Sequence, residues 1–142
     1  MRTFIFTLIM LTSIQLSQAA SSDIVWYSYV GTNQYAFTVS QIEIAKTPIW
    51  RKSDDQPPLA PGKALRFARA RLAKLVSDPN NWELYSLNLQ PLHRADDHWV
   101  YLANFQPTPP TNGPSGGFPS MMAIPVLMSG VAVDPIIGPW KR

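Results

Sequence analysis

The chain has 142 residues, no cysteine and a formal net charge of +3 at pH 7. A hydrophobic content of 46% excludes wholesale disorder, and this length favours one domain with its own core over two. The absence of cysteine excludes a disulfide framework, and the small positive charge argues against a nucleic-acid-binding protein, because such domains are usually strongly basic.

The first residues have the pattern of a signal peptide. Arg2 gives a positive start, residues 4–14 form an apolar run, and Ser17 and Ala19 occupy the −3 and −1 positions of a small-residue cleavage site. The run is shorter than the roughly 20 apolar residues that a membrane-spanning helix needs. We therefore predict a cleaved signal peptide at residues 1–19.

The predicted mature chain, residues 20–142, is a single domain without cysteine. Such a chain holds together by packing alone, because it has no disulfide to constrain it. This composition suits a bacterial periplasm or cell exterior better than a eukaryotic secretory route. We expect an exported bacterial protein, periplasmic or secreted, with no transmembrane segment in the mature chain.

Two strands are predicted at the start of the mature chain, at residues 23–30 and 35–44, where β-branched and aromatic residues are frequent. In the second segment the apolar alternation changes phase near Ser40, which indicates a β-bulge or an edge position. Residues 47–60 are a connector, because their prolines and charged residues continue neither a strand nor a helix.

The strongest periodic pattern predicts an α-helix over residues 61–76, with Pro61 in the first turn, where its missing N–H costs nothing. Apolar residues recur on one side at a 3.6-residue period: Ala64, Leu65, Ala68, Leu72, Leu75 and Val76. Cations occupy the rest of the circumference: Lys63, Arg66, Arg69, Arg71 and Lys74. Phe67 interrupts the charged side and projects among these cations.

A β-meander is predicted after the helix. Residues 82–92 alternate as a strand, and residues 98–105 return after a hairpin tip at residues 94–97. The inward side of the first of these strands carries three residues: Tyr85, Leu87 and Leu89. A helix followed by antiparallel strands predicts an α+β fold, in which an antiparallel sheet packs on a single main helix.

The C-terminal third combines a loop, a hairpin and a tail. Residues 106–119 form a Pro/Gly-rich loop that is long enough to be mobile or to bind something. Residues 120–128 are expected to pair with residues 131–133 across a tight turn that contains Gly130. Residues 134–142 are predicted to be an irregular tail, because they are punctuated by Pro and Gly.

Several of these segments together resemble a known group of modules. The stretch Pro57 to Ala70, the strand from Trp82 to Leu92, Trp99-Val100-Tyr101 and the closing hairpin from Val126 to Val133 resemble small exported bacterial proteins of unknown function. Those proteins resemble PepSY-type and cystatin-like modules, in which a helix with an Ala-x-x-x-Ala spacing precedes a β-meander. The resemblance covers about residues 57–134 and implies a module that binds or inhibits a protease.

The one cluster of residue types with metal chemistry lies at the predicted hairpin tip. His93 and His98 flank a turn that carries Asp96 and Asp97, and opposed strand positions bring Cβ atoms to about 4.5–5.5 Å. Two imidazoles and carboxylates could bind Zn or Cu or perform acid–base chemistry. The alternative is a solvated turn, in which polar residues are common, and we favour this alternative.

The sequence contains no recognisable catalytic motif. Without cysteine a nucleophile would be a serine, and no serine lies in a G-x-S-x-G pattern. The pairs Asp54-Asp55 and Asp96-Asp97 are adjacent within loops, so their carboxylates splay into water instead of converging on a substrate. We therefore expect a protein that is not an enzyme and that uses no cofactor.

The cationic side of the helix allows two interpretations. It is either a solvated face whose Arg and Lys stems cover nearby aromatics, or a surface that binds a polyanion or an anionic membrane with help from Phe67. Its candidate binding residues are Lys63, Arg66, Phe67, Arg71 and Lys74.

The sequence leaves three functions open, and we favour them in the following order. The first is an exported, non-catalytic module that binds or inhibits another macromolecule, with no nucleic acid among its partners. The second is binding of a polyanion or an anionic membrane surface through the basic helix face. The third is a hydrolase or a metal-binding protein that uses the hairpin of His93 and His98.

Overall fold

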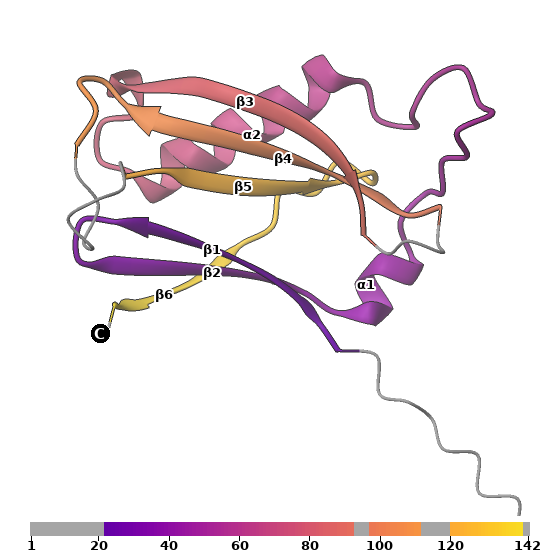
Figure 1. The fold of residues 1–142 in the computed structure, drawn as a ribbon, viewed down its shortest axis with the longest axis horizontal. Helices are drawn as coiled ribbons and strands as arrows, with labels where there is room; N and C mark the ends of the chain where they lie inside the picture. The colour runs from indigo at the N-terminus through magenta and orange to yellow at the C-terminus, as the bar shows by residue number, and fades with distance from the viewer. Residues whose placement is uncertain (1–21, 93–96, 112–119, 141–142) are drawn as a thin grey trace, which may run out of the picture.

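A computed structural model describes residues 22–92, 97–111 and 120–140 of the chain (Figure 1). The predicted signal peptide, most of the Pro/Gly-rich loop, and His93 and Asp96 of the predicted hairpin tip lie outside these residues. The described helices and strands are β1 (Ile24–Val30), β2 (Asn33–Val39), α1 (Gln41–Ala45), α2 (Pro61–Leu75), the 3-10 turn η1 (Pro79–Asn81), β3 (Trp82–Pro91), β4 (Trp99–Pro107), β5 (Met122–Leu127) and β6 (Pro135–Pro139).

The predicted α+β class is confirmed, but the strands form two antiparallel sheets and not one. One three-stranded sheet has the order β1-β2-β6 and the other the order β3-β4-β5. The last strand of the first sheet, β6, lies in the segment predicted to be an irregular tail. Its prolines stand at the two ends of a short edge strand, where a missing N–H removes little from the ladder.

The two sheets meet along β5. Tyr29 of β1 bridges Met121, and the backbone N–H of Ala123 donates to the buried Ser28 hydroxyl at 2.8 Å. Further along the same edge of β5, Leu127 donates to the carbonyl of Val131. Pro125 lies between these two donors and has no N–H of its own. This edge of β5 is therefore shared between β1 at one end and the closing hairpin at the other.

The second predicted strand ends five residues early, and the predicted bulge at Ser40 is wrong. Ser40 is instead the N-cap of the short helix α1. Its hydroxyl accepts the backbone N–H of Glu43 at 3.3 Å, and the Glu43 carboxylate accepts the backbone N–H of Ser40 at 2.9 Å. This reciprocal capping box begins a helix, because it satisfies donors that the first turn leaves free. The change of apolar phase is thus the change from a strand period to a helix period.

Tyr85 does not face inward as predicted. The β3–β4 register shifts between Leu84 and Ser86, so Tyr85 is the extra residue of a β-bulge, and it is 64% exposed. The bulge returns Leu84 to the same side as Leu87 and Leu89, and these three leucines pack against the core. On the inward side of β3, these leucines and Trp82 therefore pack against the core in place of Tyr85.

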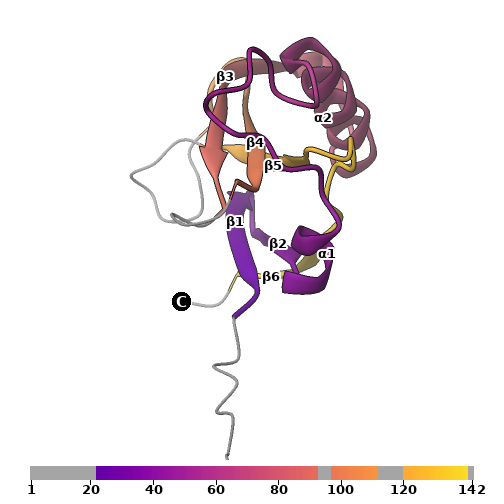
Figure 2. The same ribbon diagram turned by 90° about the vertical axis from the view of Figure 1, so that its right-hand side faces the viewer.

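Helix α2 covers one face of the β3-β4-β5 sheet, and the β1-β2-β6 sheet extends below it (Figure 2). The predicted apolar side is confirmed, because Ala64, Ala68 and Leu72 are buried. They pack in one core with inward residues of both sheets, which include Phe37, Val39, Phe105, Met122, Ile124 and Val126. None of the helices in the described part of the chain has the length and hydropathy of a membrane span.

Candidate binding surfaces

The outward side of the β1-β2-β6 sheet is the first candidate surface. Tyr27 lies beside Ala36, which lies beside Ile136, so one row of side chains crosses all three strands. Tyr27 is 54% exposed and Ile136 is 73% exposed. We call this surface the outer sheet face, and its residues are Val25, Tyr27, Tyr29, Gln34, Ala36, Thr38, Ile136 and Gly138.

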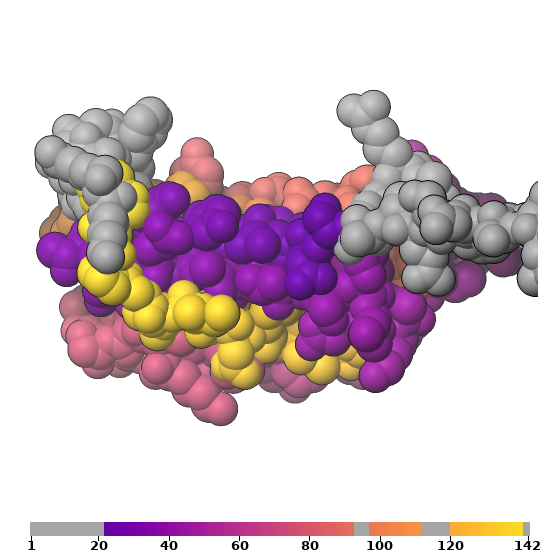
Figure 3. All heavy atoms as spheres, turned by 90° about the horizontal axis from the view of Figure 1, so that it is seen from below, coloured from indigo at the N-terminus to yellow at the C-terminus, as the bar shows by residue number. Residues whose placement is uncertain are grey.

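The outer sheet face carries no charged residue in its strands, and its large side chains are aromatic or aliphatic, with Gln34 and Thr38 as polar members. The strands β1, β2 and β6 contain no Asp, Glu, Lys, Arg or His. The ring of Trp140 packs edge-on against Tyr29, with centroids 6.1 Å apart, and extends the aromatic surface at one end. Figure 3 shows the three strands side by side as one continuous surface of the molecule. The side chains on the opposite side of β2, Tyr35, Phe37 and Val39, are buried.

The cationic side of α2 is the second candidate surface. Among the described residues, Arg71 is the one cation of this helix in an ion pair, and its partner is Asp134. Arg69 lies 5.7 Å from the centroid of the Phe105 ring, in the position of a cation–π contact. Lys63, Arg66 and Lys74 are exposed, and none of them lies within salt-bridge distance of an acid in the described part of the chain.

Three of the five predicted binding residues come together in a groove beside α2. Phe67, Arg71 and Lys74 line it from the helix with Ala70, and Gly130, Val131 and Ala132 line it from the closing hairpin. Its volume is about 230 Å³. Lys63 and Arg66 do not line this groove, which we call the α2 groove. The hairpin side was not predicted, because sequence periodicity does not show which hairpin lies next to a helix.

Gly130 allows the close approach of the hairpin to the helix. It has a φ of +86°, which favours glycine, and a Cβ atom here would lie 3.1 Å from the Phe67 ring. The backbone N–H of Gly130 donates to Leu127, which closes the turn. A larger residue at this position would strain the turn and push Phe67 away from the wall of the groove.

Arg71 connects α2 to the chain that leads into β6. Its Nη1 donates to the Asp134 carboxylate, and its Nη2 donates to the carbonyl of Ala132 at 3.0 Å. The third nitrogen, Nε, is buried and has no acceptor among the described residues. The guanidinium is therefore fixed from one side, and its side chain is only 20% exposed.

His98 and Asp97 do not converge on a common point. The Nδ1 atom of His98 lies 3.0 Å from the Thr47 hydroxyl, and that hydroxyl donates to the carbonyl of Ile44. The hydroxyl proton is thus engaged, so Nδ1 of His98 is the donor in its contact with Thr47. Asp97 lies 3.6 Å from Nε of Arg51. Within the described residues no group of three metal-ligating side chains is found.

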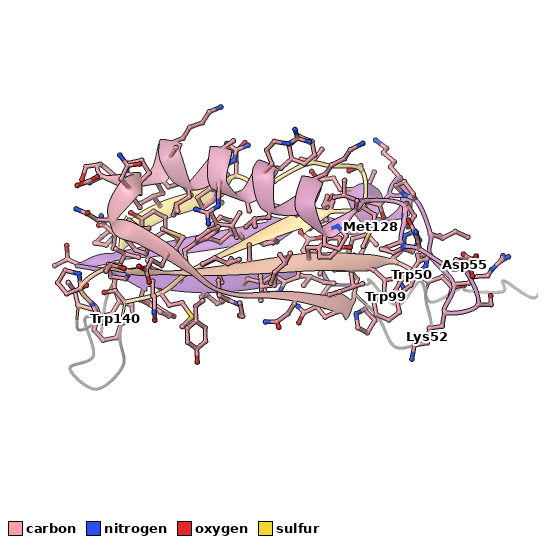
Figure 4. All side chains as sticks on the ribbon, turned by 90° about the horizontal axis from the view of Figure 1, so that it is seen from above. Trp50, Lys52, Asp55, Trp99, Met128 and Trp140 are labelled. Carbon is pink, nitrogen blue, oxygen red and sulfur yellow. The ribbon has the colours of Figure 1, made fainter. Side chains whose placement is uncertain are left out.

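Two tryptophans attach the connector to the hairpin that carries His98. The backbone N–H of Trp50 donates to Asp97, and the Trp99 indole N–H donates to the carbonyl of Trp50 at 2.9 Å. Their rings meet edge to face at 5.0 Å, with Lys52 near Trp99, at the end of the molecule opposite Trp140 (Figure 4). These contacts hold the hairpin that carries His98 against the connector, so the position of His98 follows from packing within the fold.

Among the described residues, two groups away from these surfaces have a displaced pKa. Hydrogen bonds from the Ser40 backbone and hydroxyl hold the pKa of the Glu43 carboxyl below its usual value. Burial raises the pKa of Tyr101, whose hydroxyl donates to the carbonyl of Leu59 at 2.9 Å. The first shift belongs to the capping box of α1, and the second reflects the burial of Tyr101 where β4 meets the connector.

No known protein family, curated protein or solved structure matches this chain. The resemblance to PepSY-type and cystatin-like modules therefore stays a prediction.

Proposed function

We propose that this protein is an exported, non-catalytic module that binds another protein through the outer sheet face. The observation that carries this proposal is a solvent-exposed three-stranded sheet surface without a charged residue in its strands. Contiguous exposed apolar surface of this kind is typical of interaction sites in proteins that otherwise cover themselves with polar groups.

The composition of the face fits an interface core. Interface cores are depleted of charge and enriched in tyrosine and tryptophan, and here Tyr27, Tyr29 and Trp140 lie among aliphatic side chains. These side chains are not part of this chain's own core, because Tyr35 and Phe37 of β2 fill the opposite side of the sheet. The strand register fixes the spacing of the exposed residues, so the surface is organised before any partner binds.

The absence of charge on the outer sheet face also indicates what kind of partner surface can bind it. A charged group pressed against this face would lose water and find no opposite charge, which is costly. The partner is therefore a protein with an uncharged, apolar patch that matches a sheet surface. The resemblance to PepSY-type and cystatin-like modules makes a protease the first class of partner to test.

Site-specific crosslinking tests where a partner lies. A photoreactive phenylalanine analogue placed at position 27 should form crosslinked adducts in cells that produce the protein, because Tyr27 is a large, 54% exposed aromatic residue in the middle of β1 on this face. The matched control is position 85, since Tyr85 is also an exposed strand tyrosine, at 64%, but belongs to the other sheet. Adducts from position 85 and none from position 27 would contradict the proposal.

A second candidate function has its own observation. The exposed cations Lys63, Arg66 and Lys74 have no acidic partner in the described part of the chain, which favours a polyanion or an anionic membrane surface. Retention on heparin should then fall steeply with salt, because exposed charges are screened over about 10 Å at 0.1 M salt and about 3 Å at 1 M. Retention that survives reversal of Arg66 and Lys74 to glutamate would remove this candidate.

A further inference from the structure

We propose that the α2 groove binds a small organic anion, which has a short apolar body and one carboxylate. The groove combines apolar walls, an exposed ammonium and a fixed guanidinium within one volume of about 230 Å³. This site requires neither the outer sheet face nor polyanion binding, because a single small molecule fills it.

The apolar part of the ligand is matched by both walls. Phe67 on the helix is 38% exposed, and Val131 on the hairpin is 54% exposed, so two apolar side chains face solvent across the groove. Ala70 and Ala132 line the groove between them. Pockets for drug-sized ligands have volumes of about 300–1,000 Å³, so a groove below that range selects a smaller molecule.

The charged part of the ligand is matched by Lys74 and Arg71. Lys74 is exposed at the groove without an acidic partner in the described part of the chain, so its ammonium is available to a carboxylate. Arg71 presents a guanidinium, whose planar donors suit a carboxylate in particular. Together they give one wall of the groove a positive charge next to an apolar surface.

The carboxylate of Asp134 competes with the ligand carboxylate for Arg71. This carboxylate pairs with Arg71, but the Asp134 side chain is 75% exposed, so a ligand carboxylate can displace it without opening the core. Arg71 keeps its bond to the carbonyl of Ala132 during this exchange and stays in position. Removal of the Asp134 charge should therefore strengthen binding, whereas removal of the Lys74 charge should weaken it.

The test is a titration of the isotope-labelled mature protein with octanoate, followed by NMR. We expect saturable shifts of the backbone amides of Ala70, Gly130 and Ala132. Acetate lacks the apolar body and octylammonium has the opposite charge, so neither should reproduce these shifts at the same concentration. Vesicles of phosphatidylglycerol provide a separate comparison, which distinguishes a free acid from a membrane surface.

Four variants make the titration specific to the groove. Lys74→Gln should raise the dissociation constant of octanoate about two- to fivefold, the range of exposed charge pairs, and Asp134→Asn should lower it by a similar factor. Arg66→Gln and Asp55→Asn make the same charge changes away from the groove and should leave the constant unchanged.

Three results would overturn the site. The first is equal binding of octylammonium, which would show an apolar groove without charge selection. The second is an equal effect of Arg66→Gln and Lys74→Gln, which would show general attraction to a basic helix. The third is binding to phosphatidylglycerol vesicles without any shift by octanoate, which would assign the basic face to membranes.

Discussion

Helix α2 and the β1-β2-β6 sheet both bury one side in the same core, but their solvent sides have opposite chemistry. The helix exposes cations around its circumference, whereas the sheet exposes tyrosine, valine and isoleucine without one charge in its strands. The helix thus follows the rule for a surface element, with apolar residues inside and charges outside. On the open side of the sheet, β1 and β6 expose large apolar or aromatic side chains, whereas β2 contributes Gln34, Ala36 and Thr38.

The sequence of β1 shows this difference directly. Ile24 and Trp26 face the core, whereas the alternating residues Val25, Tyr27 and Tyr29 face outward. An antiparallel strand with one solvent-exposed face normally alternates apolar and polar residues. A nearly continuous apolar run is instead typical of strands that are covered on both faces. This composition is the reason why we propose that a partner protein covers the outer sheet face.

The largest expected effect separates the two sides of α2. Ala68→Asp should unfold the protein, because it places a carboxylate without a partner in the core. Ala73→Asp makes the same change on the exposed side and should leave the midpoint of thermal unfolding nearly unchanged. Circular dichroism melts of both variants check this, and a folded Ala68→Asp protein would contradict the packing of α2.

The next effect separates the two sides of the β1-β2-β6 sheet. Phe37→Ala removes a fully buried ring and should cost about 3–5 kcal/mol of the free energy of unfolding. Tyr27→Ala, in the strand beside it, should cost about 1 kcal/mol or less, since that ring is half exposed. Urea unfolding measures both values. A large cost at Tyr27 would mean that the outer sheet face serves stability instead of binding.

A smaller effect tests the capping box that separates β2 from α1. Ser40→Ala should cost about 1 kcal/mol, the usual value for loss of an N-cap hydroxyl. Ser53→Ala in the exposed connector is the control and should lie within about 0.5 kcal/mol of the wild type. Equal values for both variants in urea unfolding would show that α1 does not depend on its cap.

The smallest expected effect is a loss of stability at acidic pH. The pKa of Glu43 is lowered in the folded state, so its contribution to stability is complete above the unfolded value of about 4.3 and is lost as the pH falls through the folded pKa. Glu43→Gln keeps an acceptor but does not titrate in this range. The stability advantage of the wild type over this variant should therefore shrink as the pH falls below the unfolded value of about 4.3. Thermal midpoints measured along this series check the sign.

Local patterns in the sequence predicted the elements that depend on local contacts. The period of Ala64, Ala68 and Leu72 predicted α2, and the turn around Gly130 predicted the closing hairpin. The helix α1 was missed although its signal was present, because the Ser40-x-x-Glu43 capping box lay at the end of a strong strand pattern. The bulge at Tyr85 was missed because alternation alone predicts an unbroken ladder.

Long-range pairing could not be predicted in the same way. The strand β6 pairs with β2, about a hundred residues earlier in the chain, and its prolines gave the pattern of a tail. The division into two sheets and the meeting of Phe67 with Gly130 likewise depend on contacts between distant segments. The residues that β1 and β2 contribute to the outer sheet face were visible as a strand pattern, but their exposure follows only from the arrangement of the sheets.

The central claim is that a partner protein binds the outer sheet face. The most direct test is to measure, at low and high salt, the affinity of this protein for a partner that the crosslinking experiment has identified. The double substitution Tyr27→Ser and Ile136→Ser should weaken binding about 30-fold, as expected for loss of about 2 kcal/mol at an interface centre, whereas Tyr85→Ser should not. Between 50 mM and 500 mM salt the wild-type affinity should change little, since the outer sheet face has no charge to screen. A steep loss of affinity with salt, together with sensitivity to Lys63→Gln and Arg66→Gln but not to the double substitution, would contradict the claim and assign binding to the basic side of α2.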